Sequence, residues 1–472
     1  MRWAVVLLSF ALLGGCASDF RTSPVPDHIL NSELLPPVSK LNSSNATVRF
    51  WGDTYSPELN AAFENKLRQT ARQLKNNRYN SRFKKNPATG KLIVPTYFLA
   101  LSGGAEDGAY GAGVLSTWKN PETGRLPAFN IVTGISTGAL IAPIAFLASS
   151  DNPRLRAKYL PKLGDIYKVP GDKLASLQIL SAFTGSAAAF LDNSGLQHQI
   201  ETFANRQLIE DVERESQKGR SLLIGTTNLE AQRPVIWDLG AIATRPRYES
   251  KEKRQARHDL FRKVLLASTA VPGAFPPVKI QINADNTVYE ELHVDGGTSK
   301  QVFLFPSEID LNQVSAALNQ MTGENPGIEL RYELFIIRNG RVHARGKRVE
   351  PKGVAAFVPI LASTIPIIKR SISTLIHYQG RGDLHRLRNL ACLYDIKYHL
   401  TAIPDSFNEE AETTYDLTYM NHLFKAGQDF GARADTRRTI LYNNKNRDRA
   451  GSHWYRGPPE WKKCSNGSPS RN

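Results

Sequence analysis

Short apolar runs alternate with helix-length segments through the middle of the chain. The run Tyr97–Leu101 leads through a glycine-rich loop into a helical pattern from Ala109 to Trp118. The run Phe129–Thr133 then leads through a tight glycine-containing turn into a second helical pattern, Ala139–Leu147. Apolar strands that alternate with helices are typical of a mainly parallel sheet covered on both faces. The pattern therefore predicts a three-layer α/β/α fold.

The alternation continues to about residue 302 and then changes character. Ser221–Thr226 is another apolar run, His258–Ala267 has the pattern of a basic amphipathic helix, and Val288–Val294 alternates like a strand. Beyond residue 302, Leu330–Ile337 is strand-like, and the uncharged stretch Val354–Ile368 is too short to span a membrane, so we expect a core or interfacial helix pair there. We predict an α/β domain at 95–302 and a helical C-terminal extension at 303–432 that packs on it.

The two ends of the chain differ from this middle part. One Arg precedes the apolar run Trp3–Leu13, as in a secretory signal. Residues 16–94 begin with prolines among Ser and Asn, which predicts an extended tether or a strap over the core. Lys66–Lys91 carries nine basic residues and no acidic one, so it is either a solvated face or a patch for phospholipid headgroups. The basic tail 433–472 is expected to be partly disordered.

Composition and charge narrow the possible partners. With 472 residues, 41% of them hydrophobic, the chain can bury a large core. A formal net charge of +16 suits nucleic acid and an anionic membrane surface equally, and export favours the membrane. Besides Cys16, only Cys392 and Cys464 are present, too few for a disulfide scaffold and in no metal-binding spacing. Cys392 lies in an apolar run and is expected to be buried; whether it pairs with Cys464 stays open.

The end of the signal segment carries its own motif. Leu13-Gly14-Gly15-Cys16 resembles the lipobox of bacterial lipoproteins. The resemblance implies that a signal peptide, residues 1–15, is removed and that Cys16 becomes lipidated. Ala17 follows the cysteine, where an Asp would favour the inner membrane. The expected location is therefore the bacterial cell envelope, anchored by lipid, in the outer membrane.

The candidate nucleophile lies in Gly134-Ile135-Ser136-Thr137-Gly138, between a predicted strand and a predicted helix. Gly134 and Gly138 leave room for a tight strand-to-helix turn. Ser136 then lies at the N-terminus of the helix, whose partial positive charge favours a developing anion.

A glycine-rich loop upstream could receive that anion. Gly103, Gly104 and Ala105 follow a strand and open a helix, so their backbone N–H groups can point at a negative oxygen. The competing interpretation is a nucleotide phosphate loop. It is disfavoured because the loop lacks the Gly-Lys-Ser/Thr ending of a P-loop.

A base for the serine is the third requirement. Asp295 follows a strand-like segment and precedes two glycines that open space around it. The alternative is a turn Asp that bonds its own backbone. No histidine after Asp295 sits in a glycine-rich loop at a strand end, so the Ser, acid, His order of ordinary α/β-hydrolases is not indicated.

Together these motifs resemble the patatin-like phospholipase family, in which a glycine-rich oxyanion loop, a G-x-S-x-G serine and a D-G-G/A aspartate follow in this order. The segment Ala267–Val278 also matches the family pattern, and its apolar character suits a wall of the acyl site. The resemblance covers about residues 95–302. It implies a patatin-like fold and a dyad of Ser136 and Asp295 that acts through an acyl-enzyme without metal or cofactor. Two residues depart from the family loop: Ala105 replaces its third glycine, and Asp107 replaces its Arg or Lys.

The expected function is therefore that of a serine hydrolase for carboxylic esters, a phospholipase A that cleaves fatty-acyl esters of membrane phospholipid. Two alternatives stay open: an esterase or thioesterase for soluble acyl substrates, and a non-enzymatic lipid-binding lipoprotein. A nucleic-acid partner is not expected, and the sequence indicates neither a protein partner nor the lipid class.

Overall fold

The computed structural model describes residues 23–39, 41, 48–54, 62, 64–66, 68–72, 84–165, 194–244, 246, 248–272, 275–304, 311–323, 327–344, 346, 359–411, 416–434 and 454. The predicted signal peptide and Cys16 lie outside these residues. Three further segments lie outside them: residues 73–83 of the basic segment, residues 354–358 of the uncharged stretch, and the tail except for residues 433, 434 and 454.

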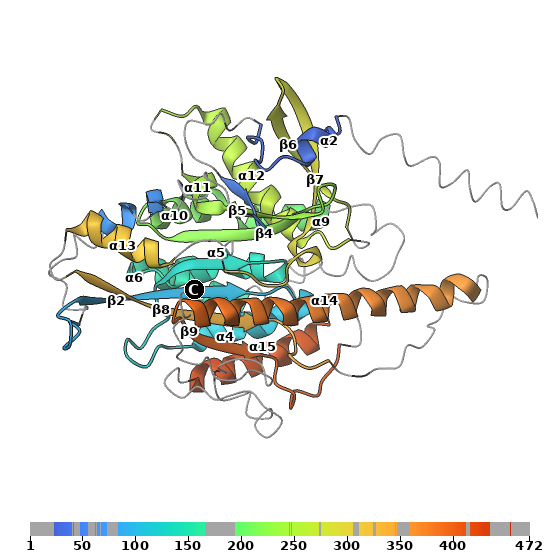
Figure 1. Cartoon of the computed structure of the whole chain (residues 1–472). Coiled ribbons are helices and arrows are strands. Elements are labelled where there is room, and N and C mark those ends of the chain that lie inside the picture. The colour runs from blue at the N-terminus through green and yellow to red at the C-terminus, as the bar shows by residue number, and fades with distance from the viewer. Residues whose placement is uncertain are drawn as a thin grey trace, which may run out of the picture.

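In the described part of the chain, nine strands form one sheet (Figure 1). They are β1 (Arg49–Trp51), β2 (Leu92–Leu101), β3 (Phe129–Gly134), β4 (Ser221–Asn228), β5 (Arg233–Asp238), β6 (Val278–Ala284), β7 (Thr287–Asp295), β8 (Ile328–Arg338) and β9 (Lys397–Ala402). Their order is β1-β5-β4-β3-β2-β8-β9, and β7 joins at β4 and pairs with β6. The five neighbouring strands β4-β3-β2-β8-β9 pair in parallel with one another, as predicted. At the β4 side of the sheet, β1, β5, β6 and β7 add antiparallel pairings.

Helices cover both faces of this sheet. They are α2 (Asp27–Leu30), α4 (Gly108–Thr117), α5 (Thr137–Ala148), α6 (Pro153–Tyr159), α7 (Lys162–Asp165), α9 (Ser194–Phe203), α10 (Arg206–Ser216), α11 (Leu239–Ala243), α12 (Lys251–Thr269), α13 (Leu311–Thr322), α14 (Pro359–Leu393) and α15 (Leu417–Arg433), with the 3₁₀ turns η1 (Ala105–Asp107) and η3 (Gly296–Thr298). None of the helices among the described residues is both long and apolar enough to cross a membrane.

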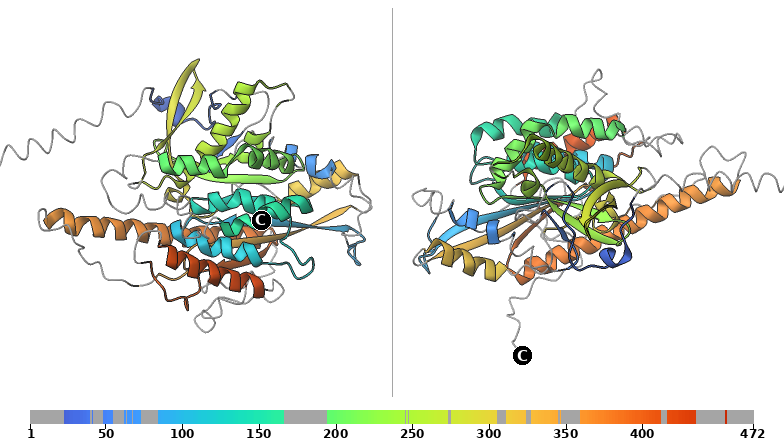
Figure 2. Two further views of the ribbon diagram at one scale, coloured as in Figure 1. Left: turned by 180° about the vertical axis from the view of Figure 1, so that it is seen from behind. Right: turned by 90° about the horizontal axis from the view of Figure 1, so that it is seen from above.

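The alternation of side chains along β2 explains the three layers. Leu99 and Leu101 point into one apolar core, which also contains buried residues of α4, α5, α12 and α15. Phe98 and Ala100 point into a second core with residues of α13 and α14. Because successive side chains of a strand face opposite sides, a strand that is apolar throughout requires cover on both. Figure 2, viewed from above, shows the sheet between these two helical layers.

The extension beyond residue 302 is more than the predicted helical addition. β8 pairs in parallel with β2 from Leu92 opposite Ile328 to Leu101 opposite Ile337, and β9 continues the sheet. These strands satisfy the backbone groups along β2 that would otherwise form an open edge. In place of a helix pair, α14 is a single helix of 35 residues from Pro359, and one end of it projects from the body (Figure 1).

Residues 23–39 form the strap that was one of the two predictions for the N-terminal segment. Ser39 donates its N–H to the carbonyl of Gln281 at 2.9 Å, and Glu290 donates to the carbonyl of Ser23 at 2.8 Å, so the strap lies along the β6–β7 hairpin. Arg49 and Glu291 form a buried ion pair nearby.

Two residues of the C-terminal part, Cys392 and Trp454, lie in surroundings that the sequence did not predict. Cys392, expected to be buried, is exposed, because it lies one residue before the end of α14, next to the exposed Leu393. It is also disulfide-bonded. Trp454, within the predicted tail, is fully buried and packs against Trp118 and Phe335.

Candidate active site

The turn around Ser136 has the tight geometry that its two glycines predict. Ser136 caps α5 with φ +54° and ψ −125°, a left-handed conformation rare for a residue with a side chain. A Cβ at Gly134 would lie 2.4 Å from the carbonyl oxygen of Gly138, and one at Gly138 would lie 2.6 Å from that of Leu101. Only glycine fits at either position, so the strand and helix can hold the serine at the apex of the turn.

Ser268 near the end of α12 braces this turn. Its hydroxyl accepts the backbone N–H of Ser136 at 3.1 Å and donates to the carbonyl of Gly225 in β4 at 2.7 Å. Sequence reasoning missed this role, because the apolar character of Ala267–Val278 predicts only a wall of the acyl site. Val271 and Pro272 from that segment do line the cavity described below.

Asp295 ends β7, directly beside the serine. Its backbone N–H donates to the carbonyl of Ala270 at 2.9 Å, and its Oδ1 accepts the N–H of Gly297 at 2.7 Å. Burial raises the pKa of Asp295 to about 7, although the bond from Gly297 acts to lower it. The Ser136 side chain also lies close enough to the carboxyl to lower its pKa. Asp295 is thus both a turn residue bonded to its own backbone and a partner of Ser136.

The glycine-rich loop passes alongside the serine. A Cβ at Gly103 would lie 3.2 Å from the Cβ of Ser136. The N–H of Gly103 already donates to the carbonyl of Gln301 at 3.1 Å. For the N–H groups of Gly104 and Ala105 we find no partner among the described residues. In this conformation two of the three predicted oxyanion donors are therefore open.

Two residues of the C-terminal part hold these loops in place. Asn339, just after β8, donates from Nδ2 to the carbonyl of Ser102 at 2.8 Å and accepts the N–H of Gly111 at 3.1 Å. Asp383 of α14 accepts the N–H groups of Gln301 at 2.6 Å and of Val302 at 3.3 Å. Sequence reasoning missed both, because Asn339 precedes a glycine as turn residues do and Asp383 resembles any surface acid on a helix.

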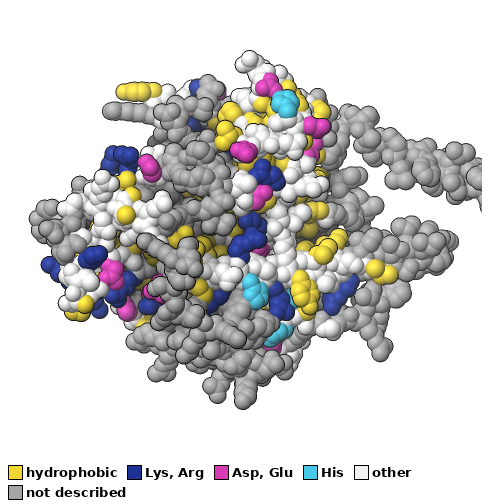
Figure 3. All heavy atoms as spheres, viewed as in Figure 1, with side chains coloured by type: hydrophobic (Ala, Val, Ile, Leu, Met, Phe, Trp, Pro, Cys, Tyr) yellow, Lys and Arg dark blue, Asp and Glu magenta, His cyan; other side chains and the backbone are white. Residues whose placement is uncertain are grey.

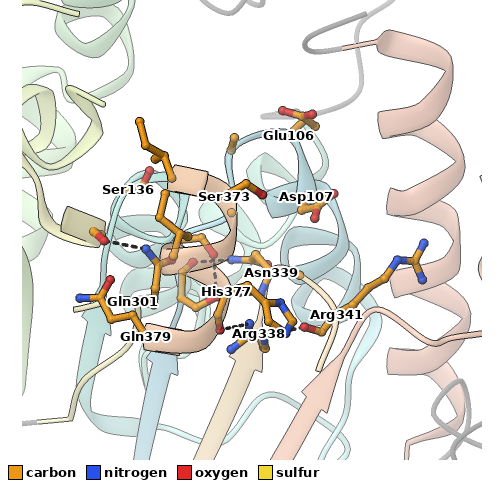
Figure 4. Close-up of a pocket in the computed structure, with 18 of the residues that line it drawn as sticks. Glu106, Asp107, Ser136, Gln301, Arg338, Asn339, Arg341, Ser373, His377 and Gln379 are labelled. Carbon is orange, nitrogen blue, oxygen red and sulfur yellow. Dashed lines mark hydrogen bonds between the residues drawn. The ribbon is translucent and has the colours of Figure 1, made fainter. Parts of the chain in front are cut away.

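Ser136 and Asp295 open onto a cavity of about 880 Å³. The glycine-rich loop lines one side, and residues 370–379 of α14 line another (Figure 4). Arg338 and Arg341, which flank Asn339, also contribute to its wall. The site therefore combines residues from both sides of position 302.

Asp107 occupies the position where the family loop carries a cation. The hydroxyl of Tyr419 in α15 donates to its Oδ1 at 2.7 Å. Burial raises the pKa of Asp107 to about 7, against the lowering effects of this bond and of the positive charges of Arg341 and Arg338. The loop itself thus offers no positive charge to a substrate.

Comparison with known proteins identifies similarity over part of the chain. Residues 99–305 match the model of the family described as patatin-like phospholipase. No curated protein matches the chain. Among solved structures, VipD from Legionella pneumophila is 12% identical, with 73% of this chain and 70% of VipD covered and a TM-score of 0.28. Human GIVD cytosolic phospholipase A2 is 14% identical, with 66% of this chain and 54% of the human chain covered and a TM-score of 0.30. The chain thus spans about half the length of the human enzyme.

Proposed function

We propose that the chain is a serine acyl hydrolase that cleaves fatty-acyl esters of membrane phospholipids, on the premise that residues 99–305 match the patatin-like phospholipase family. The observation that carries the proposal is that Ser136 and Asp295 line one cavity together, with the serine side chain acting on the buried carboxyl. A serine in a strained turn, a carboxylate in contact with it and a loop with open N–H groups are the parts that acyl transfer requires.

In the proposed reaction, the Ser136 oxygen attacks the carbonyl carbon of the ester while Asp295 accepts the hydroxyl proton. The tetrahedral oxyanion lies against the N–H groups of Gly104 and Ala105, and Gly103 keeps its bond to Gln301. When the alcohol leaves, it takes the proton from Asp295, and Ser136 carries the acyl group. Water, deprotonated by the same carboxylate, then attacks the acyl-enzyme; as the bond to Ser136 breaks, Asp295 returns the proton to the serine oxygen and the fatty acid leaves.

The raised pKa of Asp295 supports its assignment as the base. An ordinary Asp titrates near ~4 and is a weak base at neutral pH. A base with a pKa of about 7 is close to the operating pH, where general-base catalysis is most effective. Oxyanion donors add about 3 kcal/mol of transition-state stabilisation each.

The surface of α14 supports a membrane substrate over a soluble ester. Ile367, Leu375 and Tyr378 are 55%, 71% and 59% exposed, and Leu375 and Tyr378 also line the cavity that contains Ser136. Figure 3 shows hydrophobic side chains next to basic ones on this face. Exposed apolar residues beside basic ones are typical of helices that lie in a membrane interface.

We further propose that Cys16 anchors the chain by lipid in the outer membrane of a bacterial cell, on the lipobox resemblance alone. Replacing Cys16 by Ser should move the protein from the membrane fraction to the soluble fraction of expressing cells. A Cys16→Ser protein that still sediments with outer membranes after a high-salt wash would contradict the anchor.

The hydrolase proposal is tested by fatty-acid release from phospholipid vesicles by the purified chain, alongside Ser136→Ala and Asp295→Asn. Loss of release in both variants, with circular dichroism unchanged, is the expected result. Release from short soluble esters alone would favour an esterase. Lipid binding without any release in the parent protein would favour a non-enzymatic lipoprotein.

A further inference from the structure

Arg338 is a buried cation on the wall of the cavity that contains Ser136. It ends β8, and only 7% of its surface is exposed. Its Nε donates to the carbonyl of Arg341 at 3.0 Å, and its Nη2 donates to the carbonyl of His377 at 3.4 Å. These two contacts fix the plane of the guanidinium against β8 and α14.

The charge of Arg338 has no carboxylate partner within 4.0 Å among the described residues. Asp107 is bonded to Tyr419, and Asp383 is bonded to the backbone of Gln301 and Val302. Burial, with the nearby charge of Arg381, lowers the pKa of Arg338 to about 10. A buried charge without a counter-ion destabilises the folded chain, so the position indicates a negative partner that is not part of the described protein.

A second polar group without a partner lies next to Arg338. The Nε2 atom of His377 is buried and makes no hydrogen bond within the described residues. Burial, together with the charges of Arg338 and Arg381, lowers the pKa of His377 to about 4, so the ring is neutral at pH 7 and can donate one N–H. Figure 4 shows His377 beside Arg338 on the same side of the cavity as Arg341.

We propose that Arg338, with His377, forms a subsite for the phosphate diester of a phospholipid headgroup in the cavity of Ser136. The proposal rests on the proposed hydrolase function, since it names the part of the substrate that is recognised. A planar guanidinium with fixed donors binds phosphate oxygens well, and a neutral His N–H adds a further donor.

The subsite also explains how the chain can lack a cation in its glycine-rich loop. Asp107 occupies the position at which the family's glycine-rich loop has an Arg or Lys. Arg338 lies at the end of β8, which follows residue 305 in the sequence. Both residues line the same cavity. The phosphate-binding charge is thus contributed by the segment that lies outside the family match.

The experiment compares two lipids with identical acyl chains, phosphatidylglycerol and diacylglycerol, in mixed micelles with the full chain. Arg338→Gln should lower kcat/KM on phosphatidylglycerol about 30-fold to 100-fold, the effect of losing a charged hydrogen-bonding group, and change diacylglycerol hydrolysis less than about threefold. Arg338→Lys should lie between. Arg433→Gln is the matched control, because Arg433 is an exposed residue of α15 outside the cavity. Equal loss on both lipids by Arg338→Gln would overturn the subsite.

Direct titration separates the subsite from the catalytic function and from folding defects. Calorimetry measures binding of glycerophosphoglycerol, which has the diester but no acyl chains, and of inorganic phosphate to the parent and to Arg338→Lys. Binding of the diester that weakens in the variant supports the subsite, even if the parent hydrolyses neither lipid. Binding of inorganic phosphate alone would overturn the headgroup assignment, and binding of neither would overturn the subsite itself.

Discussion

Burial favours the protonated form of Asp295, whereas the proposed role as a base requires the ionised form. Asp295 is 4% exposed, and its carboxyl accepts the N–H of Gly297. A carboxyl whose folded pKa is raised binds its proton more tightly in the folded chain than in the unfolded chain. The stability it contributes is therefore complete below the unfolded pKa near ~4 and is lost as the pH rises through about 7.

From this sign we predict that Asp295→Asn stabilises the folded chain at pH 8 by roughly 2–4 kcal/mol and only slightly at pH 4. The same change should lower kcat about 10²-fold to 10⁴-fold. Denaturant unfolding at both pH values measures the first effect. In the parent, kcat/KM should rise with pH through about 7, where Asp295 loses its proton. A stability difference that does not depend on pH would contradict the raised pKa.

Ala105 in the glycine-rich loop is strained in a similar way to Ser136. It has φ +49°, a region that costs a residue with a Cβ about 1 kcal/mol relative to glycine. We predict that Ala105→Gly raises the unfolding free energy by about 0.5–1 kcal/mol and retains hydrolysis, because the N–H stays in place. Thermal unfolding at one pH measures the change. Ala109→Gly is the control: Ala109 lies in helix α4, so glycine should destabilise the chain there. Destabilisation by Ala105→Gly would show that the loop does not hold this conformation in solution.

At the scale of elements, α15 positions the glycine-rich loop by packing on α4. The helices approach through glycine: a Cβ at Gly427 would lie 2.2 Å from the carbonyl oxygen of Tyr110, and one at Gly113 would lie 2.2 Å from that of Phe424. Because α4 follows the loop directly, separation of the two helices would move Gly104 and Ala105 away from Ser136.

We therefore predict that Gly427→Ala destabilises the chain by about 3 kcal/mol and lowers kcat, because the added methyl overpacks a contact between backbones. Gly382→Ala in α14 is the matched control, since no atom lies within 4 Å of the Cβ it would add. That change should stabilise by about 0.5–1 kcal/mol, because alanine favours the helix. Equal effects of the two changes would refute close packing of α4 and α15.

Elements with a self-contained pattern could be predicted from the sequence, and the contacts between them could not. The predicted strand Phe129–Thr133 is β3, and the predicted helix Ala139–Leu147 lies within α5, because each signal is local. The braces Ser268, Asn339 and Asp383 bind backbone groups far away in the sequence. A single polar residue in a helix or turn belongs to no repeating pattern that would indicate a distant backbone partner. Such a contact is therefore visible only in the folded structure.

At the scale of the whole molecule, the segment that matches the family lacks part of the sheet and two supports of the site. β8 pairs with β2 along ten residues, and Asn339 and Asp383 hold both loops at the serine. We predict that residues 92–305, which keep all of β2, are insoluble or inactive when expressed alone, because β2 then has an open edge. Residues 23–434 should retain more soluble protein, measured by the soluble fraction and by ester hydrolysis. Full activity of the 92–305 fragment would contradict this.

The late position of β8 in the sequence has a consequence for when the enzyme can become active. The chain emerges from the ribosome, and crosses a membrane if it is exported, with its N-terminus first. Ser136 and Asp295 precede Asn339 and Asp383, so an incomplete chain has its reactive groups but lacks the supports of the glycine-rich loop. The pairing of β2 with a strand more than two hundred residues later is also intrinsically slow. If the chain is the exported lipid hydrolase proposed above, this order would delay assembly of its active site until the C-terminal part has also crossed the producing cell's bilayer.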